Sequence, residues 1–440
     1  MVVHLPVGIY ACILRYLLGD LYDPENDDEL VEKGRQEAFK LRLVSKTVRG
    51  ILDSWLYRKL WCPPDRAVEI LCHTMIAQPG LGAWAEQIYV EEDQGGEHSE
   101  EEEEDDEDEA EDDPDLEIRQ LARKRREVII AAAETIKRTF QSDPSSRYSQ
   151  ALEKNDLNWL TRSTVKTRKW ILLFQLSKLK SLTLKTHTDK FTNMALFLRL
   201  PCLEELDFAV LAPGHDGPAH AADNYAPPED ILGTIISSTS QLKSIKFEDM
   251  SGTAYQPVQH DAPRLKRILE QHAAATLTYL SICLTNNDEK DWRMEQEFSH
   301  IKGYFGSMEK FTRLQGLVMQ LEVLLGRPSD GLRLRDVLPA QLQYFTGLNL
   351  PDYHGTEDTD RLWKEEDYLQ QFQNLAAAAV DGRHFASLKS VKMHLDRKDH
   401  FNDTFDWPRK GQYDDGILAD SRIYFGWVSG PYGWEGPGPD

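Results

Sequence analysis

The sequence lacks the patterns that mark several classes of protein. Only five of its 440 residues are cysteines, and no two of them form a CxxC pair, which argues against a disulfide framework or a zinc site. It contains no GxSxG, no HExxH and no glycine-rich phosphate-binding loop. No apolar run reaches the roughly 18 to 20 residues that a membrane helix needs. We therefore expect no metal, no cofactor and no membrane partner. The missing motifs do not exclude an enzyme by themselves, but the docking module and the repeats described below predict a chain without catalytic residues.

The N-terminal stretch MVVHLPVGIYACILRYLLGDLY is apolar, but it does not resemble a signal peptide. It has no cationic start, Pro6 interrupts it, Arg15 splits its apolar part, and no small-residue cleavage site follows. Together with the scattered cysteines, this predicts a reduced, intracellular protein that is cytoplasmic, nuclear or both.

The acidic excess lies in one segment. Residues 91–117 hold 19 of the 74 acidic residues and no Lys or Arg, so the rest of the chain carries a formal charge of −4 against −23 for the whole. Ten acids follow one another over 100–109, and like charges at this density favour disorder. The segment is a solvated loop or a bait for basic partners such as histones. The nearly balanced remainder does not indicate nucleic-acid binding.

The cationic run RKRR at 123–126 follows the acidic segment. It matches a nuclear-import signal, or it heads a helix that pairs with the acids upstream and continues through EVIIAAAETIKRTF.

Three short helices are predicted at the N-terminus. Apolar residues recur at helical intervals between Leu5 and Leu17, and Pro6 suits a helix start. A second helix is expected over 35–44, and Ser45 is a suitable N-cap for a third. The third helix should bury Val48, Leu52, Trp55 and Leu56, carry Leu60 and Trp61 at its end, and stop at Pro63 and Pro64. So small a core is expected to complete itself against a partner.

These first 60 or so residues resemble the F-box family. The likeness is carried by LPVGIYACILRYL at the start, LRLVSK in the middle and LYRKLW at the end. It implies docking onto a Skp-type adaptor and, through it, onto a cullin. By position, the implied adaptor-binding residues are Leu5, Pro6, Ile9, Ile13, Leu17, Leu41, Val44 and Lys46. The alternative is a local helical bundle that caps the next domain.

A six-residue pattern recurs through the larger part of the chain. It has apolar residues at its first, fourth and sixth positions, and its copies begin at Leu179, Leu203, Leu242, Leu277, Leu314, Phe345 and Leu388. Stretches with helical composition, such as RLKRILEQHAAA, lie between them. A short strand followed by a helix and a return is the leucine-rich-repeat arrangement, in which parallel strands line the inner curve of a solenoid. An ordinary α/β domain with coincidental apolar triplets is the alternative.

The variable positions of the copies predict the concave face. They place Ser181, Glu205, Glu248 and Gln320 there, and we select as substrate-binding candidates Thr183, Lys185, Asp207, Lys246, Tyr279, Ser281, Asn349, Lys392 and His394. This mixed polar surface suits an unknown protein substrate better than nucleic acid. The aromatic C-terminal tail, 424–440, is expected to cap the last repeat or to bind a partner.

The fold class predicted from the sequence is therefore α/β: a short N-terminal helical F-box module, then a leucine-rich-repeat-like solenoid with a parallel inner sheet, of the kind common in fungal F-box proteins. The predicted parts are 1–62 F-box-like module, 63–90 helical connector, 91–117 acidic segment, 118–175 helical connector, 176–400 repeats and 401–440 cap or tail. The predicted function is a non-catalytic substrate receptor of a Skp–cullin–F-box ubiquitin ligase. The alternative is a repeat scaffold that is independent of ubiquitin and binds a protein partner, such as histones, through its acidic run.

Overall fold

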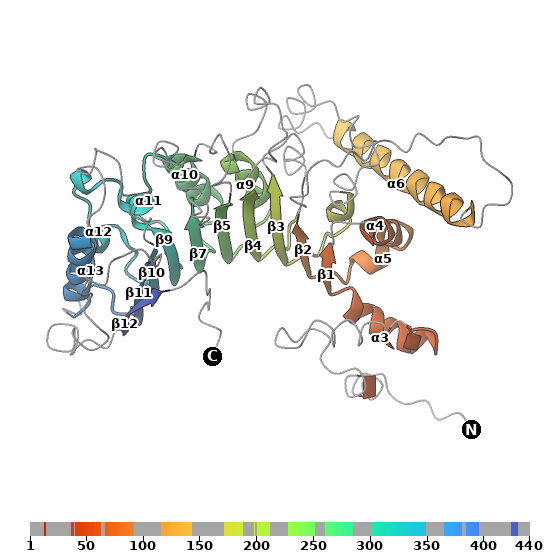
Figure 1. Ribbon diagram of the computed structural model, residues 1–440, viewed down its shortest axis with the longest axis horizontal. Helices are drawn as coiled ribbons and strands as arrows, with labels where there is room; N and C mark the ends of the chain where they lie inside the picture. Colours follow the sequence, from red (N-terminus) through yellow and green to blue (C-terminus); the bar gives the residue numbers. More distant parts are fainter. Residues whose placement is uncertain are drawn as a thin grey trace, which may run out of the picture. The chain divides into compact units, whose positions relative to one another are not determined.

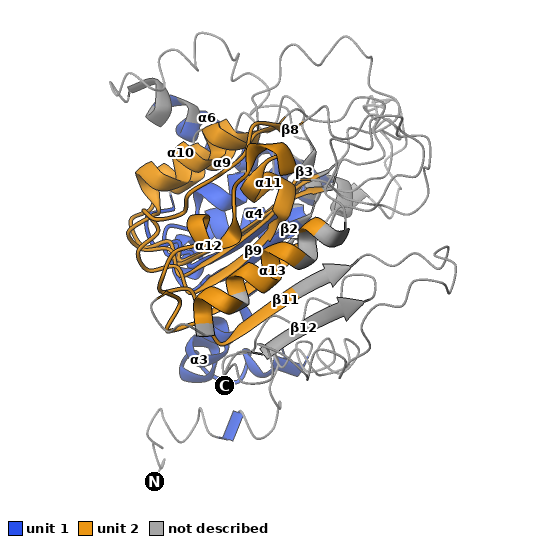
Figure 2. Ribbon diagram, turned by 90° about the vertical axis from the view of Figure 1, so that its left-hand side faces the viewer, with its two compact units in different colours: residues 1–184, 197–203 blue, residues 185–196, 204–440 orange. Residues whose placement is uncertain are grey.

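The computed structural model describes the chain in two compact units. One unit comprises residues 1–184 and 197–203, and the other comprises 185–196 and 204–440 (Figure 2). The described residues are 13–14, 37–38, 40–62, 67–91, 116–142, 171–187, 198, 200–211, 228–250, 260–284, 301–348, 365–380, 384–395 and 424–429.

Unit 1 combines helices with the first strands of the chain (Figure 1). Its elements are α3 (Lys46–Leu56), β1 (Lys59–Cys62), α4 (Ala67–Ala77), α5 (Pro79–Gly82), β2 (Gln87–Glu91), α6 (Leu116–Ser142) and the first part of β3 (Ser181–His187). Strands β1 and β2 are parallel, with Leu60 opposite Ile88. Buried Cys72 and Met75 of α4, with Ile129 and Ala133 of α6, show the faces on which these helices are apolar.

The structure of unit 1 bears on the predicted start and end of the third helix and on the helix around the cationic run. Ser45 is the N-cap of α3, and its hydroxyl accepts a hydrogen bond from the Val48 N–H at 3.1 Å, as expected. The cationic run 123–126 lies within α6, so a helix through EVIIAAAETIKRTF is confirmed, but it begins at Leu116 and the run does not head it. The prediction that Leu60 and Trp61 lie at the end of the third helix was wrong, because both residues belong to strand β1. The chain leaves the helix at Tyr57, where β1 can pair with β2.

Unit 2 alternates strands with helices. After the rest of β3, its elements are β4 (Glu205–Leu211), α9 (Pro228–Ser237), β5 (Ser244–Met250), β6 (His260–Asp261), α10 (Ala262–His272), β7 (Tyr279–Cys283), β8 (Ile301–Lys302), β9 (Gly316–Gln320), α11 (Leu321–Leu325), η5 (Pro328–Asp330), α12 (Leu334–Val337), β10 (Tyr344–Leu348), α13 (Glu365–Val380), β11 (Ser390–Leu395) and β12 (Tyr424–Ser429). The protein is thus a mixed α/β structure, and none of its described helices is long and apolar enough to cross a membrane.

The strands of unit 2 are parallel and follow chain order in space. Their order is β4-β5-β7-β9-β10-β11-β12, while β6 and β8 form a separate parallel pair. One hydrogen-bond pattern marks strand starts in both units: the carbonyl of the residue immediately before a strand accepts two successive N–H groups at the start of a later strand. These carbonyls belong to Arg58, Glu86, Glu204, Lys243, Thr278, Gln315 and Gln343.

The core of unit 2 is built from the apolar positions of the predicted six-residue pattern. Across the strands, Leu206, Ile245, Leu280, Leu317, Phe345 and Val391 form one register row, and all are buried. A second row contains Phe208, Phe247, Ile282 and Met319, and the rings of Phe208 and Phe247 stack with centroids 5.7 Å apart. In Figure 2 the helices α9 to α13 lie on one side of these strands.

The sixth repeat was assigned out of register. Phe345 pairs with Leu317 and Val391, so it occupies the fourth position of the pattern and not the first. The first position is Leu342, which is fully buried and donates its N–H to the Pro339 carbonyl at 3.1 Å. Gly347 then holds the sixth position, and the ring of Phe372 on α13 occupies the space that a larger side chain takes in the other repeats.

Strand β12 extends the sheet beside β11, with Lys392 opposite Gly426. The aromatic segment 424–440 therefore begins with a sheet strand, and its residues 430–440 lie outside the described residues. Strands β1, β2 and β12 were not anticipated from the sequence pattern.

Candidate functional site

A short turn in unit 1 exposes two aliphatic side chains. The N–H groups of Arg42, Leu43 and Val44 bond back to Ala38, Lys40 and Leu41 at 3.0–3.2 Å, so the helical segment ends at Leu41 and not at Val44 as predicted. Leu43 is 88% exposed and Val44 69% exposed. Large aliphatic side chains so fully open to water are surface that a partner can cover.

Two charged residues beside this turn, Arg42 and Asp53, lie inward. Asp53 is buried on α3, and the Arg42 Nε lies 2.5 Å from its Oδ1. The Arg42 guanidinium also lies 5.6 Å from the centre of the Tyr57 ring. Arg49 approaches Asp53 from the same helix at 3.6 Å but remains half exposed. The Arg42–Asp53 pair fixes the turn, so Leu43 and Val44 project outward while the neighbouring cation is largely buried.

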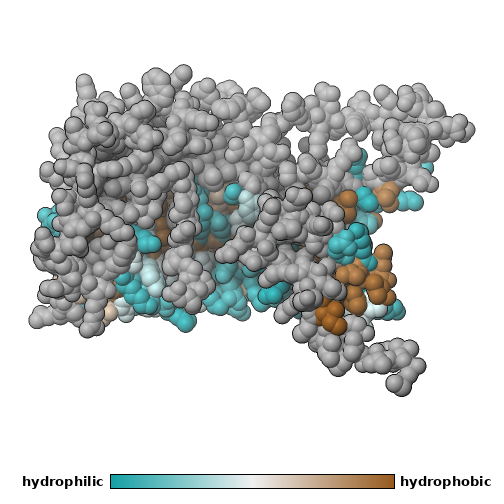
Figure 3. All heavy atoms as spheres, turned by 60° about the horizontal axis from the view of Figure 1, so that its bottom comes forward, coloured by the Kyte–Doolittle hydropathy of each residue, from teal (hydrophilic) through white to brown (hydrophobic). Residues whose placement is uncertain are grey.

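Exposed apolar side chains gather in unit 1. Among described residues, the exposed large hydrophobic side chains are Ile13, Leu43, Val44, Ile70, Trp84, Leu121 and Ile130 in unit 1 and Tyr304 in unit 2. Figure 3 shows hydrophobic, brown surface over the N-terminal helices of unit 1, on the right of the view.

Half of the predicted adaptor-binding residues can be located. Ile13 and Val44 are exposed, Leu41 is half-buried and Lys46 is exposed at the start of α3. Leu5, Pro6, Ile9 and Leu17 lie outside the described residues. Leu43 was not among the predicted adaptor-binding residues. Its position in the sequence, next to Arg42 and followed by Val44, could have indicated an exposed aliphatic residue at this turn.

The predicted concave face corresponds to the sheet face turned away from the helices. One register row on it contains Asp207, Lys246, Ser281, Val318, Thr346 and Lys392. In neighbouring rows of the same face, Tyr279 lies opposite Ser244, and His394 lies opposite Leu348. Thr183 and Lys185 alternate with buried Leu182 and Leu184 on β3, whereas Asn349 lies outside the described residues.

A charged group lies on the open face of β4 and β5. The Lys246 Nζ lies 3.0 Å from Oε2 of Glu248 and 3.7 Å from Oδ2 of Asp207. Burial raises the pKa of Asp207 above its usual range, although Lys246 opposes the shift. Burial lowers the pKa of Lys246, but Asp207 and Glu248 outweigh burial and raise it overall. Lys246 is therefore a permanent cation at neutral pH, suited to recognising charge and not to acting as a nucleophile or base.

The same face becomes apolar toward β10. Tyr279 packs against a buried cluster of Cys283, Val318 and Leu348, and its ring lies over Gly316, where a Cβ would come within 2.7 Å of it. Burial raises the pKa of Tyr279, so its hydroxyl keeps its proton at neutral pH.

Two polar residues of the predicted surface are not available to a partner. Ser281 and Gln320 lie on the predicted face, but they are 1% and 2% exposed. The Gln320 Oε1 accepts the Leu284 N–H at 2.9 Å and so satisfies a buried backbone group of the preceding repeat. The expectation that Ser281 and Gln320 form part of the exposed recognition surface was therefore wrong.

A buried histidine cluster was missed by the sequence reasoning. His260 places Nδ1 3.0 Å from the Glu229 Oε1 and Nε2 2.7 Å from the Asp249 Oδ2. Burial lowers the pKa of His260, but the two carboxylates outweigh it and raise the pKa to about 9. Both ring nitrogens are committed and the side chain is fully buried, so the cluster is a structural tie between β5, β6 and α9 and not an acid–base centre. The cluster could not be recognised in the sequence, because Asp249 and Glu229 are 11 and 31 residues away from His260.

The described residues contain no group of three or more His, Cys, Asp or Glu side chains that could hold a metal ion. In comparisons with known proteins, no family model, no curated protein and no solved structure matches the chain. The structure is therefore the basis for proposing a function, and the proposal draws on the apolar turn at 42–44 and the charged sheet face.

Proposed function

We propose that the chain is a substrate receptor of a Skp–cullin–F-box ubiquitin ligase. The single observation that carries the proposal is the pair Leu43 and Val44, exposed on a turn that Arg42 and Asp53 hold in place. In this proposal the turn, with Ile13, Leu41 and Lys46, docks onto a Skp-type adaptor and through it onto a cullin. Burying two aliphatic side chains there offsets the cost of association.

The substrate arm of the proposal is a leucine-rich-repeat-like solenoid. Three observations support it. The parallel strands follow one another in chain order, a carbonyl before each of several strands accepts two N–H groups of a later strand, and the helices lie on one side of the strands. A doubly wound α/β sheet would instead reverse its strand order and carry helices on both faces. In a solenoid each repeat contacts its neighbours and the strands form one continuous face.

The proposed mechanism is proximity and requires no catalytic residue in this chain. Asp207 and Lys246, with Tyr279 nearby, would contact a protein substrate on the sheet face turned away from the helices, while the buried Glu248 holds the Lys246 ammonium in place. Lys185, Thr183, Lys392 and His394 would extend this contact. Tethering raises the effective concentration of the substrate at the ligase. We place this activity in the cytoplasm, the nucleus or both.

The test is co-expression of the full chain with a Skp-family adaptor of its own organism, followed by a binding measurement. The double variant Leu43→Glu, Val44→Glu should weaken binding roughly 100-fold or more, because two aliphatic contacts are lost and charges are buried. Ile70→Glu is the matched control, since Ile70 is also an exposed aliphatic residue of unit 1 and lies on α4. A folded wild-type chain that does not bind the adaptor would overturn the proposal.

A second candidate function rests on the acidic run. The ten consecutive acids at 100–109 favour a scaffold that binds histones or other strongly basic proteins independently of ubiquitin. The described residues define a clean deletion: β2 ends at Glu91 and α6 begins at Leu116, so removing 100–109 leaves both elements intact. Histone binding that disappears with this deletion, in a chain that shows no adaptor binding, would favour the scaffold.

A further inference from the structure

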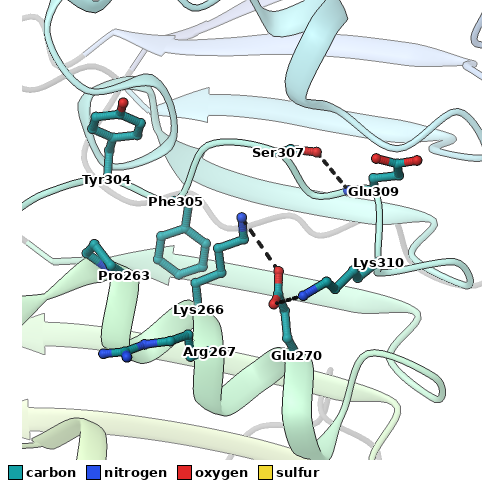
Figure 4. A pocket seen from close by; sticks show the side chains of 9 residues that line it. All are labelled: Pro263, Lys266, Arg267, Glu270, Tyr304, Phe305, Ser307, Glu309 and Lys310. Carbon is teal, nitrogen blue, oxygen red and sulfur yellow. Dashed lines mark hydrogen bonds and ion pairs between the residues drawn. The ribbon is translucent and has the colours of Figure 1, made fainter.

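Unit 2 contains a pocket on α10, outside the predicted concave face. Its volume is about 370 Å³, within the usual range for ligand sites (Figure 4). One wall is α10, with Pro263, Lys266, Arg267 and Glu270, and the other is the segment from Tyr304 to Lys310. The two walls come from parts of the chain about 40 residues apart, and no motif in either indicated a site.

The second wall is held rigidly by the backbone. The Phe305 N–H bonds to the Val323 carbonyl at 2.8 Å, and the Met308 N–H bonds to the Val337 carbonyl at 2.7 Å. Gly303 and Gly306 adopt positive φ values of 68° and 62° and allow the bends between these bonds. A wall fixed in this way costs little entropy when a ligand binds.

Tyr304 is the second feature that points to a ligand. It is the single exposed large hydrophobic residue of unit 2 within the described residues, and it lines this pocket. Its ring is held over Gly326, where a Cβ would come within 2.5 Å of a ring carbon. In Figure 4, Phe305 and Pro263 lie below Tyr304 and continue the apolar lining.

Two lysines of the pocket form ion pairs, and its arginine does not form one within the described residues. Glu270 bridges the walls, with its carboxylate 3.5 Å from the Lys266 Nζ and 2.7 Å from the Lys310 Nζ. Arg267 is exposed, and it forms no ion pair or hydrogen bond with its side chain among the residues that the structure describes. Figure 4 shows Arg267 and Glu309 on opposite sides of the pocket, with the aromatic ring of Phe305 nearer to Arg267.

We infer that this pocket binds a protein segment in which an acidic side chain adjoins an apolar one. The carboxylate pairs with Arg267, whose planar guanidinium matches a carboxylate in a two-bond arrangement. The neighbouring apolar side chain packs on Pro263, Tyr304 and Phe305. Glu309 disfavours a second acid on the far side, which sets the direction of the segment. The site lies in unit 2 and does not depend on the proposed adaptor docking.

The test is selection of phage-displayed random decapeptides on the immobilised full chain, repeated on Arg267→Glu and Arg313→Glu variants. Arg313 is the control, because it is also an exposed arginine of the same unit without a described ion pair but does not line the pocket. Peptides from the wild type and from Arg313→Glu should carry Asp or Glu beside Phe, Tyr, Trp or Leu. Their binding to Arg267→Glu should fall at least about tenfold.

Three results would overturn the inference: no enriched peptide, enriched peptides that Arg267→Glu binds equally well, or Arg267-dependent peptides without an acidic residue. Thermal unfolding of each variant checks that the fold is intact. A Tyr304→Ala variant separates the apolar contact from the charge, and it should also weaken binding of the selected peptides. Failure of this test leaves adaptor binding unaffected, because that binding is measured separately with Leu43 and Val44 variants.

Discussion

At the scale of single residues, the His260 cluster should make the stability of unit 2 depend on pH. The folded-state pKa of about 9 lies above the ordinary value of 6.5, so protonated His260 stabilises the fold. This contribution, about 3 kcal/mol, is fully present below pH 6.5 and is lost as the pH rises through 9. The groups that face His260 are Glu229, Asp249 and the Phe247 ring.

The prediction is that the wild-type chain loses thermal stability between pH 6.5 and 9.5 more steeply than a His260→Gln variant. Glutamine keeps a hydrogen-bonding side chain but cannot take the charge. Unfolding temperatures measured across this range give the difference between the two chains, which cancels other titrating groups. Parallel curves for the two proteins would contradict the assigned role of His260.

The Arg42–Asp53 pair gives a second residue-scale prediction. Arg42→Leu leaves the buried Asp53 carboxylate poorly compensated and should cost about 3 kcal/mol of local stability. Arg49→Leu should cost less than about 1 kcal/mol, because that side chain is half exposed and lies farther from the carboxylate. Hydrogen exchange of the α3 amides measures both, and equal protection loss in the two variants would argue against the pair as the anchor of the turn.

Neither residue cluster could have been found from the sequence. Asp53 reads as an ordinary helical acid, and only the folded turn brings Arg42 beside it. His260, Asp249 and Glu229 come from three different elements and share no motif. By contrast, the Ser45 cap was predictable because capping is a local interaction between residues three apart.

At the scale of elements, β10 shows how a repeat tolerates a missing side chain. Gly347 occupies a core position at which β9 has Met319, and a Cβ on Gly347 would lie 3.3 Å from Phe372 Cζ and 3.4 Å from Leu321 Cδ2. The pattern match was shifted by three residues here, because Phe345, Leu348 and Leu350 also satisfy the apolar spacing. The sequence could not reveal that a ring from α13 replaces the missing side chain.

This arrangement predicts a compensating pair of substitutions. Gly347→Met should destabilise the chain by about 1–3 kcal/mol through overpacking, and Phe372→Ala by about 3–5 kcal/mol through the cavity it leaves. The double variant should lose less than the sum, since the methionine side chain fills the space of the ring. Chemical unfolding measures the cycle, with Thr346→Met on the opposite strand face as the control. Additive losses would contradict the packing described for β10.

Short strands were the elements that pattern reasoning missed. Strand β1 has four residues and follows α3 after two intervening residues, so its apolar residues read as the end of that helix. Strand β12 contains Gly426 within an aromatic stretch, which resembles a loop. The copies beginning at Leu203, Leu242, Leu277 and Leu314 were predictable, because both apolar residues of each strand are buried.

At the scale of the whole molecule, the two proposed binding sites lie in different units of the chain. The exposed Leu43 and Val44 belong to unit 1, and the pocket around Arg267 and Tyr304 belongs to unit 2. The pocket was beyond sequence prediction, because its walls are brought together by the pairing of β6 with β8. The α/β class and the parallel strands were predictable in outline, since an apolar pattern that recurs along a chain is more specific than a single motif.

This separation predicts independent effects of substitutions at the two sites. Arg267→Glu should leave the affinity for the Skp-family adaptor within about a factor of two, and the Leu43→Glu, Val44→Glu variant should bind the selected peptides as the wild type does. Combining all three substitutions should remove both activities without a further loss of thermal stability beyond the sum. Isothermal titration of each variant with the adaptor and with a selected peptide tests this. If Arg267→Glu weakened adaptor binding, or the Leu43 and Val44 changes weakened peptide binding, the two sites would be energetically coupled, and each ligand would change the affinity for the other.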